Sequence, residues 1–362
     1  MDDAALSSFP AAPQHGPRPL PLFLDLLRRE TAGDPARQRA ALAGLAAYQR
    51  ASRGPARTIP PVVHRAGRAV LRDYGGDAND ARGVGVPILF IPSLINPHFI
   101  LDLAPERSLL RWLAARGHRV ILLDWGTPTP EDHAADIDAH VTELVVPLAR
   151  ALGEPPVLVG YCLGGTIAAA AAALTPVAGL AMIAAPWHFG GFGDAARGRI
   201  AALWAEAKPM CETMGLVPME VLQSGFWALD PARTIRKYEA FAAMPPDSDA
   251  ARTFVAMEDW ANGGAPLPYA AGAQMFDFFA HDAPGRGAWM LDGHALGPAA
   301  IQCPAIDFVS MSDRIVPHTS AMGLPDRRSL SAGHVGMVVG STAQAQLWAP
   351  LDDWISAITG RR

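Results

Sequence analysis

Apolar runs of strand length alternate with helix-length stretches through the middle of the chain. The strand-like runs are "VPILFIPS" (86–93), "HRVILLDW" (118–125), "PPVLVGYC" (155–162) and "VAGLAMIAAP" (177–186). Leu and Ala at helical spacing predict helices between them, at 108–117, at 137–153 and directly after residue 162. This alternation predicts an α/β fold with a mainly parallel sheet flanked by helices.

Two parts of the chain fall outside this alternation. After residue 186 it stops, and it resumes at "CPAIDFVSMSD" (303–313); the stretch between is rich in Trp, Phe and Met and is divided by Pro and Gly. We expect residues 187–295 to form a cap inserted between two late strands, either covering a site or forming a helical subdomain with its own small core. At the other end, "LPLFLDLLRRE" and "ARQRAALAGLAAYQRA" predict a helical appendage over residues 1–55, before a main domain of residues 56–362.

Composition and charge narrow the class of protein. Half of the 362 residues are hydrophobic and the formal net charge is -5, so no basic surface for nucleic acid or anionic lipid is expected. The three cysteines, Cys162, Cys211 and Cys303, form no CxxC pair, which favours a reducing intracellular setting over a disulfide framework. Acidic residues in "MDDAALSSFP" argue against a secretory signal, so we expect a cytoplasmic protein.

A long uncharged segment resembles a membrane span but has another explanation. No Asp, Glu, Lys or Arg occurs between Pro155 and Gly193, yet Gly and Pro divide the segment into pieces of strand and helix length. A parallel sheet covered on both faces produces such continuous apolar runs. We therefore expect a buried strand, helix and strand here, and no transmembrane segment.

The turn "GYCLGG" (160–165) fits a nucleophile elbow, in which a sharp strand-to-helix turn exposes a nucleophile. Any side chain at Gly160 or Gly164 would crowd the neighbouring strand or helix. Cys162 stands at the tip, at the N-terminus of the predicted helix, where the positive end of the helix dipole favours a thiolate. The alternative is a buried structural cysteine in a glycine-rich turn. Whether Cys162 is a nucleophile therefore depends on whether the chain also supplies a base and an acid.

A nucleophile elbow requires an acid and then a histidine later in the chain. Of His294, His318 and His334, we choose His334, because "SLSAGHVGMVVG" places it in a loop between an extended run and a helical stretch. The alternative is a solvated turn.

The acid is expected where a late strand ends, since ligand sites in such sheets gather at the carboxyl ends of the strands. Asp313 follows the strand in "AIDFVSMSD", whereas Asp307 lies within it and is a poorer candidate. Asp326 is the runner-up, and the alternative role of Asp313 is that of a helix N-cap.

Backbone N–H groups complete the predicted site. An oxyanion needs two donors, one from Leu163 after the nucleophile and one from Leu94 or Ile95 in the loop of "LFIPSLINPHFILDL". The segment "DHAADIDAH" (132–140) could suggest metal ligands but fits a polar helix face better, and HExxH and phosphate-loop motifs are missing from the sequence. No cofactor and no metal are expected.

Several stretches together resemble the polyhydroxyalkanoate synthases of the α/β-hydrolase superfamily, in particular the short catalytic subunit of the two-component enzymes. They are "IPSLINPHFILDLAPERSLLRWLAARGHRVILLDWGTP" (91–128), "GYCLGGT" (160–166), "FWALDPARTIRKYEAF" (226–241), "VAMEDWANGGAP" (255–266), "SDRIVP" (312–317) and "GHVGMVVGSTAQ" (333–344). The resemblance assigns Cys162 as nucleophile, His334 as base and Asp313 as acid, which agrees with the placement above.

The resemblance also implies a reaction. The substrate would be (R)-3-hydroxyacyl-CoA, joined to a growing polyester with release of CoA through a Cys162 thioester. Implied partners are a second synthase subunit and further copies of the chain in a homo-oligomer, at the surface of storage granules within the cytoplasm. Two alternatives stay open: a thioesterase or intracellular polyester depolymerase that uses the same triad with water as acceptor, and a non-enzymatic, partner-binding subunit.

Overall fold

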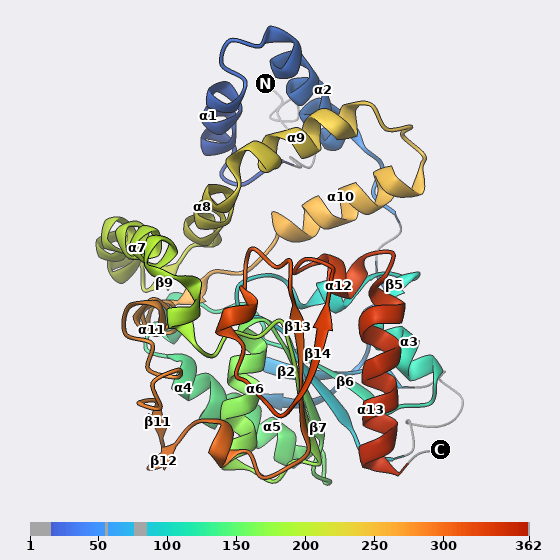
Figure 1. Cartoon of the computed structure of the whole chain (residues 1–362), viewed down its shortest axis with the longest axis vertical. Helices are drawn as coiled ribbons and strands as arrows, with labels where there is room; N and C mark the ends of the chain where they lie inside the picture. The colour runs from blue at the N-terminus through green and yellow to red at the C-terminus, as the bar shows by residue number, and fades with distance from the viewer. Residues whose placement is uncertain (1–15, 55–56, 76–84, 361–362) are drawn as a thin grey trace, which may run out of the picture. The chain divides into compact units, whose positions relative to one another are not determined.

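The computed structural model describes residues 16–54, 57–75 and 85–360 (Figure 1). These residues divide into two compact units. The larger unit contains residues 57–75, 85–225 and 263–360, and the smaller unit contains residues 16–54 and 226–262. Residues 1–15, on which the argument against a secretory signal chiefly depends, lie outside the described residues.

The larger unit is built on an eight-stranded sheet. In spatial order the strands are β1 (Val62–Ala66), β2 (Ala69–Asp73), β6 (Val120–Asp124), β3 (Ile88–Ile91), β7 (Val157–Tyr161), β8 (Gly179–Ile183), β13 (Ala305–Ser310) and β14 (Asp326–Leu330). The β1–β2 and β2–β6 pairs are antiparallel and all other pairs are parallel. Every residue of β3, β7 and β8 is buried, which explains their unbroken apolar sequences. The predicted fold class is confirmed.

Helices cover both faces of this sheet (Figure 1). The helices on one face are α3 (Leu109–Ala115) and α13 (Ala349–Thr359), and those on the other are α4 (Ile137–Ala139), α5 (Val146–Ala151) and α6 (Leu163–Leu174). A π-helical turn, His140–Val145, joins α4 to α5. Helix α6 is buried from Leu163 to Ala172, so its run of Gly and Ala is what close packing against β7 and β8 allows. The helices predicted between the strands are confirmed.

A long insertion separates β8 from β13. Its helices are α7 (Asp194–Met214), α8 (Met219–Leu229), α9 (Pro231–Ala242), α10 (Asp249–Ala261) and α11 (Tyr269–His281). Two small pairs of strands accompany them: β9 (Leu216–Val217) with β10 (Leu267–Pro268), and β11 (Met290–Leu291) with β12 (His294–Ala295). Helices α7 and α11 belong to the larger unit, whereas α9 and α10 belong to the smaller one. The predicted cap limits, 187–295, stay a prediction.

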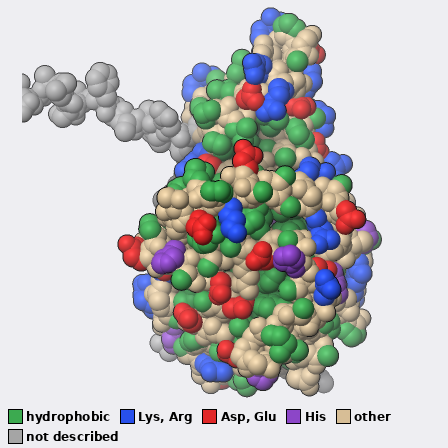
Figure 2. Space-filling view, turned by 90° about the vertical axis from the view of Figure 1, so that its left-hand side faces the viewer, with side chains coloured by type: hydrophobic (Ala, Val, Ile, Leu, Met, Phe, Trp, Pro, Cys, Tyr) green, Lys and Arg blue, Asp and Glu red, His purple; other side chains and the backbone are tan. Residues whose placement is uncertain are grey.

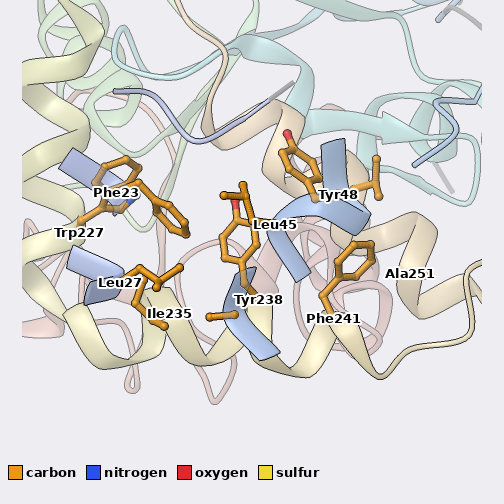
Figure 3. Close-up of a cluster of buried hydrophobic side chains, with 11 residues drawn as sticks. Phe23, Leu27, Leu45, Tyr48, Trp227, Ile235, Tyr238, Phe241 and Ala251 are labelled. Atoms are coloured by element: carbon orange, nitrogen blue, oxygen red, sulfur yellow. The ribbon is translucent and has the colours of Figure 1, made fainter. Parts of the chain in front are cut away.

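The smaller unit joins segments that are far apart in the sequence. Helices α1 (Leu20–Glu30) and α2 (Pro35–Arg50) share one core with α9 and α10. Figure 3 shows aromatic and aliphatic side chains from these four helices meeting, among them Phe23, Tyr48, Tyr238 and Phe241. Helices α2 and α9 approach so closely that a Cβ at Gly44 would lie 1.9 Å from the carbonyl oxygen of Tyr238. The two predicted N-terminal helices are confirmed, and their apolar faces are buried against part of the insertion.

The surface of the larger unit carries both signs of charge. On the face seen in Figure 2, acidic and basic side chains are interspersed among apolar ones. Among the described residues, none of the helices combines the length and the apolar character that crossing a membrane would require.

Candidate active site

Cys162 lies at a sharp turn between β7 and α6. Its backbone adopts φ 56° and ψ -133°, a conformation that costs energy for any residue with a side chain. The glycines of the motif permit the turn: a Cβ at Gly160 would lie 2.3 Å from Cα of Gly165, and one at Gly164 would lie 2.2 Å from the carbonyl oxygen of Ile91. The strand, turn and helix expected around Cys162 are therefore present.

Asp313 and His334 lie side by side at the carboxyl edge of the sheet. Asp313 follows β13 and His334 precedes α12 (Gly336–Val339). The Nδ1 atom of His334 donates to Oδ2 of Asp313 at 2.6 Å, and both residues are buried. The other carboxylate oxygen of Asp313 accepts the N–H groups of Ile315 and Val316, at 2.7 and 3.0 Å. Asp313 thus holds the histidine and caps the turn that follows it. It is not a helix N-cap, because the next helix, the 3-10 turn His318–Ser320, has Pro317 at that position.

The ring of His334 also interacts with Cys162. Burial lowers the pKa of His334, but the negative charge of Cys162, the hydrogen bond to Asp313, the charge of Asp313 and hydrogen bonding to Cys162 outweigh it and raise this pKa to about 10. Because Nδ1 is engaged by Asp313, the Nε2 edge of the ring is left for the thiol. The arrangement can hold an imidazolium next to a thiolate.

The other candidates from the sequence lie elsewhere. Asp326 begins β14 and forms an ion pair with Arg328 at 3.5 Å, and the side chains of Arg328 and Asp326 are 58% and 41% exposed. His294 and His318 are exposed. Asp307 is fully buried within β13, and among the described residues neither of its carboxylate oxygens has a hydrogen-bond partner. Burial raises the pKa of Asp307 to about 7, against the smaller lowering effects of the Arg327 charge and of nearby backbone N–H groups.

The two predicted oxyanion donors come from adjacent segments. Leu163 is the first residue of α6, where backbone N–H groups have no partner within the helix. In the loop after β3, the N–H of Ile95 donates to Oγ of Ser93 at 3.2 Å and is therefore engaged. Of the alternatives Leu94 and Ile95, Leu94 is the one that remains as a candidate donor.

Sequence reasoning missed the residues that fix this loop. Trp125 donates its indole N–H to the carbonyl oxygen of Pro92 at 3.1 Å. Asp124 accepts from Arg72 at 2.8 Å, and its second oxygen lies 3.6 Å from Nδ1 of His98. Asp124 is the last residue of β6 and Trp125 follows it, at the same sheet edge as Cys162. Their position at a strand end is the sequence signal that could have identified them.

The polar segment 132–140 uses its side chains within the fold. Asp136 caps the N–H of Ala139 at 2.7 Å, and Asp138 accepts from Gln274 and Trp289 at 2.6 and 2.8 Å. His140 is buried beside Arg68, and burial first, then the Arg68 charge, lowers its pKa to about 4. Within residues 16–54, 57–75 and 85–360, no three or more His, Cys, Asp or Glu side chains are grouped so that they could hold a metal ion.

The remaining cysteines lie away from this edge. Cys211 is buried on α7, and burial raises its pKa. Cys303 precedes β13 and lines a surface pocket of about 460 Å³ together with the end of α6. Because Asp313 follows the same strand, Cys303 and Asp313 mark opposite ends of β13.

Comparison with known proteins gives a family and relatives. The model of the family described as "Alpha/beta hydrolase family" matches residues 88–347. The chain is 28% identical to the poly(3-hydroxyalkanoate) polymerase subunit PhaC of Haloferax mediterranei over 317 residues, which covers 83% of this chain and 64% of that protein. It is 26% identical to the subunit of the same name from Allochromatium vinosum over 314 residues, covering 81% of this chain and 87% of that one.

Solved structures are also similar. One is a thermophilic esterase from Thermogutta terrifontis, 19% identical, with a TM-score of 0.43 and coverage of 84% of this chain and 100% of the other. Another is the monoacylglycerol lipase of Paleococcus ferrophilus, 12% identical, with a TM-score of 0.46 and coverage of 80% and 99%.

Proposed function

This chain belongs to the alpha/beta hydrolase family and is a homologue of PhaC subunits, and from that premise we propose that it is an acyltransferase of the polyester-forming kind. It takes an (R)-3-hydroxyacyl group from CoA onto Cys162 and passes it to the hydroxyl of another 3-hydroxyacyl unit. The observation that carries the proposal is the buried Asp313–His334 pair, 2.6 Å apart, beside a cysteine at a strained strand-to-helix turn.

The first half-reaction loads the cysteine. The thiolate of Cys162 attacks the thioester carbonyl, and the oxyanion accepts hydrogen bonds from the N–H groups of Leu163 and Leu94. When the tetrahedral intermediate collapses, the bond to the CoA sulfur breaks and CoA leaves as a thiol with the proton of His334. The products are a Cys162 thioester and a neutral imidazole.

The second half-reaction transfers the acyl group from Cys162 to the acceptor hydroxyl. Acylation removes the negative charge from Cys162, which is the first of the influences that raise the pKa of His334. His334 therefore becomes free to accept the proton of the attacking 3-hydroxyl, while Asp313 stabilises the imidazolium that forms. The ester bond forms and the Cys162 thiolate is expelled beside the imidazolium, which restores the starting state. The acyl group remains a thioester between the two steps, so it stays reactive toward an alcohol.

Partners and location are part of the proposal. The chain spans 64% of the length of the Haloferax mediterranei relative, so the activity of that whole protein does not transfer without test. The name of that relative describes it as a subunit, which supports a second synthase subunit here. We also propose a homo-oligomer in the cytoplasm, at the surface of storage granules.

The test measures CoA release and products together. Purified protein is incubated with 3-hydroxybutyryl-CoA and with a medium-chain 3-hydroxyacyl-CoA, with and without a candidate second subunit, followed by polymer extraction. The proposal predicts CoA release with polymer, complete loss of both in Cys162→Ala, and near-normal rates in the control Cys303→Ser. Free 3-hydroxybutyrate without polymer would make the protein a hydrolase, and no CoA release under any condition would end the enzymatic proposal.

A further inference from the structure

We propose that Tyr161 is a positioning residue that holds the imidazole of His334 in line with the Cys162 thiol. The inference rests on the proposed function only in assigning His334 and Cys162 as partners. Tyr161 does not contact the reacting atoms in this role. It acts through His334, from the strand that also carries the nucleophile.

Tyr161 contacts His334 in two ways. Its ring stacks on the imidazole, with the ring centroids 5.1 Å apart and an angle of 29° between the planes. Its hydroxyl donates to the backbone carbonyl oxygen of His334 at 3.2 Å. The ring orientation and the main chain of the histidine loop are therefore both fixed by one side chain.

Tyr161 lies at a buried position in the sheet, which fixes where its ring meets the imidazole of His334. It is the last residue of β7, where it pairs with Ile183 of β8, and only 2% of it is exposed. Its neighbour in the chain is Cys162. The separation between thiol and imidazole is thus set by a buried strand end and by a stacked ring, and does not depend on the loop that carries His334 alone.

The three contacts of His334 are complementary. Asp313 fixes Nδ1 at one edge of the imidazole, and Tyr161 covers a face of the ring. A rotation of the imidazole about its bond to Cβ would break the hydrogen bond and the stacking together. The remaining edge, with Nε2, is the one presented to Cys162.

The phenol of Tyr161 stays neutral in this environment. Burial first, and then the charges of Cys162 and Asp313, raise the pKa of Tyr161 well above its usual value. A neutral phenol keeps its proton for the carbonyl of His334 and adds no negative charge next to the imidazolium. Tyr161 therefore supports the orientation of His334 without competing with it for a proton.

The experiment follows the alkylation of Cys162 by iodoacetamide, which needs no acyl-CoA. Full-length protein is treated between about pH 6 and pH 9.5, and the Cys162 peptide is quantified by mass spectrometry. Tyr161→Phe removes the donated hydrogen bond and keeps the ring, whereas Tyr161→Leu removes both. The control is Tyr238→Phe, which deletes the hydroxyl of an equally buried tyrosine that donates to Glu258 in the smaller unit.

The expected result depends on pH. Near pH 6 an ordinary cysteine thiol is mostly protonated, and a thiolate there needs a well-placed imidazolium. We therefore expect alkylation to slow about fivefold in Tyr161→Phe and about tenfold or more in Tyr161→Leu. Near pH 9.5 all rates should agree within about twofold, because an ordinary thiol is largely ionised there without a neighbouring imidazolium. Tyr238→Phe should match the wild type at both pH values.

The inference would be overturned if alkylation of Cys162 in Tyr161→Leu slowed equally at both pH values or did not slow at all. Tyr161 would then be a packing residue. If Tyr161→Leu does not fold, as judged by circular dichroism, Tyr161→Phe decides by the same comparison. His334→Ala is the reference: alkylation unchanged near pH 6 in that variant would overturn the pairing of His334 with Cys162 itself. A protein with the expected alkylation profile but no CoA release would contradict the proposed function and leave this inference standing.

Discussion

Among the described residues of the larger unit, two buried aspartate–histidine pairs occur, and their hydrogen bonds have the same length. Nδ1 of His334 lies 2.6 Å from Oδ2 of Asp313, and Nε2 of His118 lies 2.6 Å from Oδ1 of Asp352. The difference lies in what surrounds each pair. Asp352 also accepts from Arg116 at 2.5 Å, so that pair is a cross-link between α13 and the chain before β6, whereas His334 faces Cys162 and Tyr161.

The comparison shows that a buried Asp–His hydrogen bond does not by itself indicate chemistry. His118 precedes β6 at the amino edge of the sheet, whereas His334 lies at the carboxyl edge, to which Cys162 and Asp313 also belong. Distance and burial cannot separate the two pairs. The two pairs differ in the group beside the imidazole and in the edge of the sheet at which they lie. Three predictions test whether these differences separate a catalytic pair from a structural one.

The largest effect is expected for activity. Asp313→Asn should lower the rate of CoA release about 10³- to 10⁴-fold, because an amide neither stabilises the imidazolium nor fixes the required tautomer. Asp352→Asn should stay within about threefold per folded molecule, since that pair lies away from the thiol. Asp326→Asn, which changes only an exposed ion pair with Arg328, should stay within about twofold. A loss in Asp352→Asn as large as in Asp313→Asn would remove the distinction between the pairs.

The next effect concerns the titration of His334. Its pKa in the folded protein is raised to about 10, so the stability it contributes is complete below its unfolded pKa of about 6.5 and is lost as the pH rises through about 10. Cys162→Ala removes the thiolate charge, so the pKa of His334 should fall, the stability that His334 contributes should be smaller, and its loss should be complete at a lower pH. Nuclear magnetic resonance of the imidazole protons and urea unfolding at several pH values measure both changes.

The control for this titration is Cys303→Ser, which removes a thiol at the opposite end of β13 and should leave the pKa of His334 where it was. An unchanged titration in Cys162→Ala would show that the thiol does not act on the ring.

The smallest effect is expected for stability. Asp352→Asn should lower the free energy of unfolding by about 2–4 kcal/mol, because it weakens a buried pair that also holds Arg116. Urea unfolding followed by tryptophan fluorescence measures it. Asp326→Asn should change the same quantity by less than about 0.5 kcal/mol. If Asp352→Asn were as stable as the wild type, the pair would not be the cross-link that its geometry suggests.

The sequence predicted the parts of the site that local chemistry dictates. The strand, the glycines and the helix around Cys162 follow from close packing, and the order of acid and histidine follows from the positions of strand ends. The sequence could not predict that Tyr161 stacks on His334, because that contact joins residues that meet only in the folded sheet. It also could not show that Ser93 engages the N–H of Ile95, which depends on the geometry of one loop.

The helix pairing in the smaller unit could not be predicted from the sequence for a similar reason. Amphipathic spacing predicted α1 and α2, but nothing in their own sequence shows that α9 and α10 supply the opposite side of their core. The pairing depends on shape, such as the fit of Gly44 against Tyr238. Shape complementarity between distant segments leaves no periodic pattern in the sequence from which it could be predicted.

That shared core sets an order of events during synthesis. Helices α1 and α2 leave the ribosome before the rest of their core, because the side chains that bury Phe23 and Tyr48 lie on α8, α9 and α10 and follow only after β8 and α7 have been made. At about 5–20 residues per second, the first two helices wait on the order of ten seconds or more with their apolar faces exposed. The nascent chain therefore needs protection by a chaperone over α1 and α2 until α9 and α10 have been made.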